Sequence, residues 1–227
     1  TYMSFFSQMD TYGDGYAGIG VWRAAFKPLV DRIADTDIRL QWFCCDRSTG
    51  VTDDSGNRIT LIRDTQSPVA VEYQAVKFIG TGRDNIKAGV FSGWGLGDYI
   101  YLRSEEAYMI KMEALAHKGS AEAVTELNSF MKTRQPDYNY TFTNKADLIE
   151  EIIYQKRVEF WGEGLEYIDN RRLNIPVDRT DETWGAENNN HFSAGKFRYN
   201  QEDRPFLYQL PLSEIENNSQ LSPSDQN

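Results

Sequence analysis

Apolar residues recur at spacings of three and four along residues 101–135, which is the pattern of two amphipathic helices. The first expected helix ends at Gly119, and its predicted core face is formed by Leu102, Tyr108, Met112 and Leu115. The second follows the capping residue Ser120 and stops before Pro136, which has no backbone N–H to continue a helix. The pattern predicts an antiparallel pair similar to a tetratricopeptide unit.

The stretch from Asn144 to Leu173 predicts a long helix, a glycine turn and a second short helix. Asn144 is an expected N-cap with Asp147 three residues later, because Asx side chains satisfy the first free amides of a helix. Gly162 and Gly164 end the long helix by permitting positive φ. Its predicted core stripe consists of Ile149, Ile152, Ile153, Lys156 and Phe160.

Residues 1–100 are rich in glycine-containing loops, with a short helix expected at Ala24–Ala34. Two apolar segments, Gln41–Cys44 and Arg58–Ile62, flank a polar turn and predict a β-hairpin. Residues 174–201 are polar and predicted to be irregular. The expected fold is therefore mainly α, with tetratricopeptide-like antiparallel helix pairs, long irregular loops and a small β-hairpin. Residues 1–100 and 101–227 are expected to form one continuous fold.

Composition narrows the possible partners. The 227 residues carry 24 basic and 34 acidic side chains, a net charge of −10, which disfavours nucleic acids and anionic membrane surfaces. No apolar run approaches the ~20 residues of a transmembrane helix. The chain begins at Thr1, so we expect a mature or excised piece, with any signal or lipid-attachment cysteine upstream.

The sequence offers little for a metal or redox site, and we expect no cofactor. Cys44 and Cys45 are adjacent, a poor arrangement for an ordinary disulfide, and His117 and His191 are the only histidines. The acidic turn at residues 52–57 lacks the full ligand set of a calcium loop, which favours a solvated turn.

Charged residues crowd the aromatic segment 157–172, and two interpretations remain open. Glu159 and Glu163 are four residues apart, so one helical face would carry both carboxylates, and such a pair could serve a glycoside hydrolase. The other interpretation, which we favour, is a structural group of ion pairs. In this interpretation arginines pair with these acids, lower their pKa values and keep them ionised.

Aromatic residues in polar, glycine-rich loops suggest a surface for stacking on sugar rings. The candidate ligand-binding residues are Tyr12, Asp14, Tyr16, Trp22, Trp94 and Trp184. Polar contacts could also come from the run Asn188–Asn190. The alternative is that these aromatic loops pack on the core.

Several blocks resemble the SusD/RagB family of outer-membrane glycan-binding lipoproteins of Bacteroidetes. The segment Val158–Gly164 (VEFWGEG), followed by Tyr167–Asp169 and Arg171–Leu173, is similar to the family's C-terminal signature. The resemblance extends, with gaps, from about Asp37 to Asn227. Further blocks, in the family's order, are Asp37–Leu40, Leu102–Ala116, Phe206–Leu212 and Asp225–Asn227.

The resemblance implies that the chain is the C-terminal portion of such a protein, with the N-terminal half absent. It implies a non-catalytic, lipid-anchored protein at the surface of the outer membrane. Such a protein captures oligosaccharides and delivers them to a SusC-like TonB-dependent transporter. The alternative class is a glycoside hydrolase that uses Glu159 with Glu163 or Glu166.

Overall fold

The structure is a computed structural model of the chain and describes residues 24–44, 73–75, 77, 101–203 and 209–225. It comprises two compact units, Thr1–Gly162 and Glu163–Asn227. The boundary expected near residue 100 lies outside the described residues. Within the described parts of the chain, no helix is both long and apolar enough to cross a membrane.

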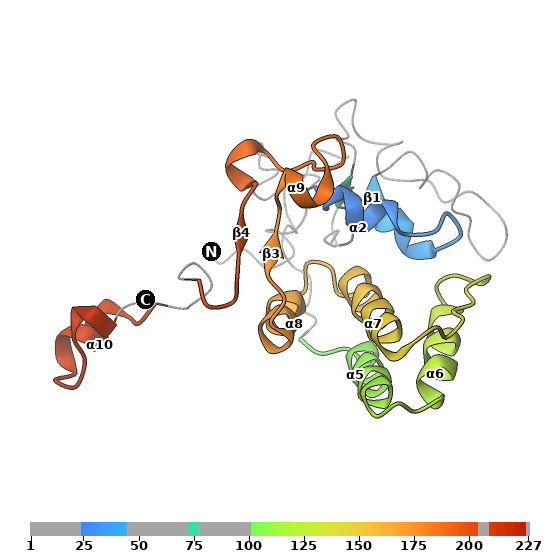
Figure 1. Ribbon diagram of the computed structural model, residues 1–227, viewed down its shortest axis with the longest axis horizontal. Coiled ribbons are helices and arrows are strands. Elements are labelled where there is room, and N and C mark those ends of the chain that lie inside the picture. The colour runs from blue at the N-terminus through green and yellow to red at the C-terminus, as the bar shows by residue number, and fades with distance from the viewer. Residues whose placement is uncertain (1–23, 45–72, 76, 78–100, 204–208, 226–227) are drawn as a thin grey trace, which may run out of the picture. The chain divides into compact units, whose positions relative to one another are not determined.

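The described part of the first unit is mainly helical, as predicted. Its elements are α2 (Lys27–Asp31), the 3₁₀ helix η2 (Ile38–Trp42), β1 (Phe43–Cys44), β2 (Gln74–Ala75), α5 (Ser104–His117), α6 (Glu122–Met131) and α7 (Lys145–Glu159). Helix α5 packs against both α6 and α7 (Figure 1). Gly119, with φ of 73°, lies between α5 and α6, where only glycine adopts the left-handed region easily. The tetratricopeptide-like character of this pair remains a prediction.

The three long helices enclose a core of fully buried apolar side chains. These side chains belong to Met109, Met112, Leu127, Met131 and Ile152, each with 0% exposure. Removing such a side chain from water contributes roughly 1.5–3 kcal/mol. Tertiary packing rather than helix propensity therefore holds these helices in place.

The predicted core face of α5 is only partly correct. Met112 is buried, but Leu102 and Tyr108 are 72% and 53% exposed, and Met109 takes the buried position instead. Apolar residues surround this helix, so periodicity alone did not distinguish the face that meets α6 and α7.

Helix α7 begins where the sequence predicts and ends before the predicted glycine turn. The Asn144 side chain accepts a hydrogen bond from the backbone N–H of Asp147 at 3.0 Å, and its amide donates to the Asp147 carboxylate at 2.7 Å. The last helical residue is Glu159. Glu159 and Gln155, both expected outside the core stripe, are 2% and 4% exposed.

A second apolar cluster joins the segment 24–44 to α7. It contains Ala25, Val30, Ile33, Leu40, Phe43, Tyr73, Ala75, Tyr154 and Val158. Phe43 also meets the ring of Trp161 edge to face, with centroids 5.7 Å apart. The segment 24–44 is therefore fixed against α7, and this contact positions the side chains described below.

A small antiparallel sheet is present, and the described partner of β1 is β2. Strand β1 pairs antiparallel with β2, with Phe43 opposite Ala75. The predicted partner, Arg58–Ile62, lies outside the described residues.

The second unit contains more regular structure than the irregular tail predicted from sequence. Its elements are α8 (Leu165–Leu173), β3 (Val177–Asp178), α9 (Asp181–Trp184), the 3₁₀ helix η4 (Ser193–Gly195), β4 (Arg198–Tyr199), α10 (Leu212–Asn217) and the 3₁₀ helix η6 (Pro223–Asp225). Strands β3 and β4 run side by side, with Val177 opposite Tyr199 (Figure 1). Such two-residue strands carry too little alternation to be seen in a sequence.

Candidate functional site

Glu159 lies at the centre of a buried group of charges. Its carboxylate oxygens lie 3.4 Å from Nη1 of Arg39, 3.1 Å from Nη1 of Arg103 and 3.3 Å from Nη2 of Arg134. Burial opposes ionisation, but hydrogen bonds and charge from Arg134, with Arg39 and Arg103, hold the pKa of this carboxyl below its usual value. Glu159 is therefore ionised near neutral pH.

Arg39 extends this group to the N-terminal segment. Only 1% of the residue is exposed, and Nη2 donates to Asp37 at 2.7 Å and to Oε1 of Gln155 at 2.5 Å. These contacts join η2 to α7 through charge-assisted hydrogen bonds, which are stronger than neutral ones.

The C-terminal end of α7 is closed by two cations. Nζ of Lys77 donates to the backbone oxygens of Glu159 and Trp161, at 2.6 and 3.1 Å, and Nη2 of Arg103 donates to the Glu159 oxygen at 2.9 Å. The last carbonyls of a helix have no partner within it, and the helix dipole places negative potential there. Both cations therefore stabilise this helix end.

The ion-pair interpretation of Glu159 is confirmed, although the partners differ from those expected. Arg39, Arg103 and Arg134 come from outside the segment 157–172 and surround Glu159. The catalytic alternative is not supported, because a general acid needs a raised pKa and access to substrate.

The proposed carboxylate pairing also fails on helix geometry. Glu163 and Glu166 do not continue α7, because the helix ends at Glu159. Gly162 and Gly164 follow with φ of 77° and 85°, which places both residues in the left-handed region. The expected shared helical face of Glu159 and Glu163 is therefore wrong.

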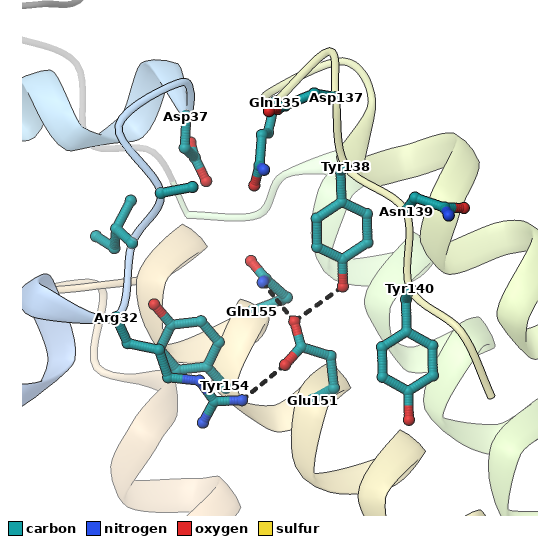
Figure 2. Close-up of a pocket in the computed structure, with 12 residues that line it drawn as sticks. Arg32, Asp37, Gln135, Asp137, Tyr138, Asn139, Tyr140, Glu151, Tyr154 and Gln155 are labelled. Atoms are coloured by element: carbon teal, nitrogen blue, oxygen red, sulfur yellow. Dashed lines mark hydrogen bonds and ion pairs between the residues drawn. The ribbon is translucent and has the colours of Figure 1, made fainter. Parts of the chain in front are cut away.

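A polar cavity of about 420 Å³ opens in the first unit, beside the buried charges (Figure 2). Segment 32–37 forms one wall, segment 135–140 the opposite wall, and α7 the floor. The lining residues are Arg32, Ile33, Ala34, Asp37, Gln135, Asp137, Tyr138, Asn139, Tyr140, Glu151, Tyr154 and Gln155.

Hydrogen bonds fix the floor of this cavity. The Glu151 carboxylate accepts from the Tyr138 hydroxyl at 2.8 Å, from Nε2 of Gln155 at 2.7 Å and from Nη2 of Arg32 at 2.7 Å (Figure 2). The Arg32 guanidinium also stacks over the Tyr154 ring, 3.9 Å from its centroid. These side chains are held in place before any ligand arrives.

The two tyrosines of this network remain protonated across the physiological range. Burial, and then the charge of Glu151, raise the pKa of Tyr138 above its ordinary value. Burial likewise raises the pKa of Tyr154, whose hydroxyl donates to the backbone oxygen of Leu29 at 3.3 Å. Both hydroxyls therefore act as hydrogen-bond donors.

Trp184 is the one predicted ligand-binding residue that falls within the described part of the chain. It ends α9 with 38% of its surface exposed, and its indole Nε1 donates to the backbone oxygen of Asp178 at 2.9 Å. The side chain is therefore held by this bond, and part of the residue remains exposed. Tyr12, Asp14, Tyr16, Trp22 and Trp94 lie outside the described residues.

The asparagine run near Trp184 is only partly available for ligand contacts. Asn189 is 6% exposed, and its amide donates to the backbone oxygen of Arg179 at 3.0 Å and to Asp181 at 2.8 Å. Asn188 and Asn190 are exposed. Burial, together with Arg179 and Lys196, lowers the pKa of His191, so this imidazole is mostly neutral at pH 7.

Sequence reasoning missed two features of these surfaces. Phe192 follows the asparagine run and is 75% exposed, yet only tryptophans and tyrosines were chosen as candidate stacking residues. The cavity was also missed. The sequence could have indicated it, because Tyr138 and Tyr140 lie on either side of Asn139. The same mixture of aromatic and polar residues was used to choose the other candidate loops.

Comparison with known proteins identifies the family. A profile of the SusD family matches residues 71–227, and no curated protein matches the chain. The fold is similar to that of a SusD-like carbohydrate-binding protein from Bacteroides vulgatus, with a TM-score of 0.62 and 20% sequence identity. That similarity covers 97% of this chain but 45% of the other, so the chain spans less than half the length of that structure. Because the profile matches more than half of the chain, this protein belongs to the SusD family.

Proposed function

We propose that this chain is part of a non-catalytic, cell-surface protein that binds carbohydrates. The observation that carries the proposal is the SusD-family match over residues 71–227. The similar structure from Bacteroides vulgatus is described as a carbohydrate-binding protein, which supports the same ligand class here.

The chemistry of the buried charges supports binding without catalysis. Glu159 is ionised, enclosed by three arginines and 2% exposed, so it cannot donate a proton to a glycosidic oxygen. Its role is to hold α7 against the segments that carry those arginines.

Glycan binding occurs through the aromatic side chains that the sequence singles out. These are Tyr12, Tyr16, Trp22, Trp94 and Trp184, with Asp14 as a hydrogen-bond acceptor. A flat aromatic face covers the apolar side of a sugar ring, while neighbouring polar groups bind its hydroxyls. The partly exposed side chain of Trp184, held by its indole N–H, supports this arrangement in the second unit.

The whole protein delivers captured oligosaccharides to a SusC-like TonB-dependent transporter, and a lipid anchor upstream of this chain holds it at the outer-membrane surface. The family resemblance supports both steps. Affinity purification of the tagged whole protein from outer membranes should recover such a transporter. Recovery of the protein without any transporter would contradict this part of the proposal.

The binding site is tested by gel electrophoresis through immobilised neutral polysaccharides. Trp184→Ala should reduce retention of the chain, whereas Trp184→Phe should keep most of it, because the phenyl ring still stacks but lacks the indole N–H. Phe142→Ala is the matched control, since Phe142 is also an exposed aromatic residue, at 54%. Equal retention of Trp184→Ala and the wild type would remove Trp184 from the site.

A further inference from the structure

We propose that the cavity between segment 32–37, segment 135–140 and α7 binds one neutral sugar ring of a glycan. The inference rests on the proposed function and adds to it a second binding site, formed by residues of the first unit. No residue of this cavity is among the aromatic residues already proposed as the binding surface.

The size and rigidity of the cavity suit a single ring. Its volume of about 420 Å³ lies within the usual range for small-molecule sites, about 300–1,000 Å³. Asp37 and Gln155 are held by the buried Arg39, and Glu151 by three donors. The walls therefore need little reordering on binding, which lowers the entropic cost of association.

The lining provides the two kinds of contact that a sugar ring needs, which are hydrogen bonds to its hydroxyls and an apolar face for the ring. Figure 2 shows the amide end of Gln135 between the Asp37 carboxylate and the ring of Tyr138. An amide donates and accepts at once, as a sugar hydroxyl does. The ring of Tyr138 supplies an apolar face on one wall.

The charge of the cavity favours a neutral ligand. Arg32 is paired with Glu151, and Asp37 with Arg39. Asp137 remains as a lining carboxylate with no ion pair among the described residues. An acidic sugar would meet this negative charge without a free cation to balance it, so uronic acids are disfavoured.

The test compares Gln135→Ala with the wild type on gels containing neutral xylan, galactan, mannan or amylopectin, or acidic polygalacturonate. Thr141→Ala is the control, because Thr141 is exposed and does not line the cavity. We expect retention of the wild type on a neutral polysaccharide, about tenfold weaker affinity for Gln135→Ala, and no change for Thr141→Ala.

The outcomes separate this inference from the proposed function. Retention of the wild type that Gln135→Ala does not weaken would overturn the cavity site and leave carbohydrate binding intact. Stronger retention on polygalacturonate than on every neutral polysaccharide would overturn the neutral ligand class. No retention of the wild type on any gel would overturn both proposals for this chain.

Discussion

Arg39 carries a full positive charge into the first unit with 1% exposure, and its position explains why the N-terminal segment stays on α7. A buried cation is tolerated only when its partners are close and well oriented. Asp37 is a neighbour in sequence, but Gln155 and Glu159 lie 116 and 120 residues away. Sequence spacing therefore revealed that Glu159 would be ion-paired but could not reveal Arg39 as its partner.

Glu159→Gln tests the buried charge cluster. The substitution leaves Arg39, Arg103 and Arg134 close together without their shared carboxylate, and we expect the free energy of unfolding to fall by about 3–5 kcal/mol. Glu150→Gln is the control on the same helix, since the Glu150 side chain is 77% exposed. It should change the free energy of unfolding by less than about 1 kcal/mol. Equal urea midpoints for the two variants would contradict the structural role of Glu159.

Acid should weaken the fold through the same carboxylate. The pKa of Glu159 lies below its usual value of 4.5 in the folded chain, so the unfolded chain takes up the proton at higher pH. Its stabilising contribution is complete above about pH 4.5 and is lost as the pH falls through the lower folded-state pKa. Thermal midpoints between pH 3 and pH 7 should thus fall more steeply for the wild type than for Glu159→Gln. Parallel pH profiles would show that Glu159 contributes nothing to acid unfolding.

Helix α7 connects the two apolar clusters of the first unit. It packs against α5 on one side and contributes to the cluster around η2 on another. Its beginning was predictable because an N-cap is a local signal: Asn144 and Asp147 are three residues apart. Its end was mistaken in the catalytic hypothesis, which extended the helix past Gly162. The cavity was not predictable, because segment 32–37 lies about 100 residues before the other two sides and meets them only after folding.

Asn144→Ala tests the start of α7. Loss of the side-chain acceptor leaves the amide of Asp147 without its cap, and the free energy of unfolding should decrease by about 1 kcal/mol. Asn144→Ser should retain most of the stability, because a serine hydroxyl can accept the same bond. Denaturant unfolding of both variants measures the difference, and equal losses for alanine and serine would rule out capping as the cause.

At the scale of the whole molecule, the sequence predicted the family and the mainly helical class correctly, because these depend on blocks of local pattern. Strand pairing and the buried face of a helix depend on tertiary contacts, which are harder to predict from the sequence. Strand β1 has β2 as its described partner, and the face of α5 that is buried includes Met109 rather than Tyr108. The net charge of −10 is a property of the whole chain, and it favours neutral over anionic polymers as ligands.

We propose that this chain binds carbohydrate without cleaving it. Binding is measured by isothermal titration of the wild-type chain with a soluble form of the polysaccharide that retains it. Cleavage is measured by an assay of reducing ends after prolonged incubation of the same mixture. We predict saturable binding heat and no increase in reducing ends. Release of reducing ends by the wild type would contradict the non-catalytic account, and the absence of binding heat would contradict carbohydrate binding by this chain.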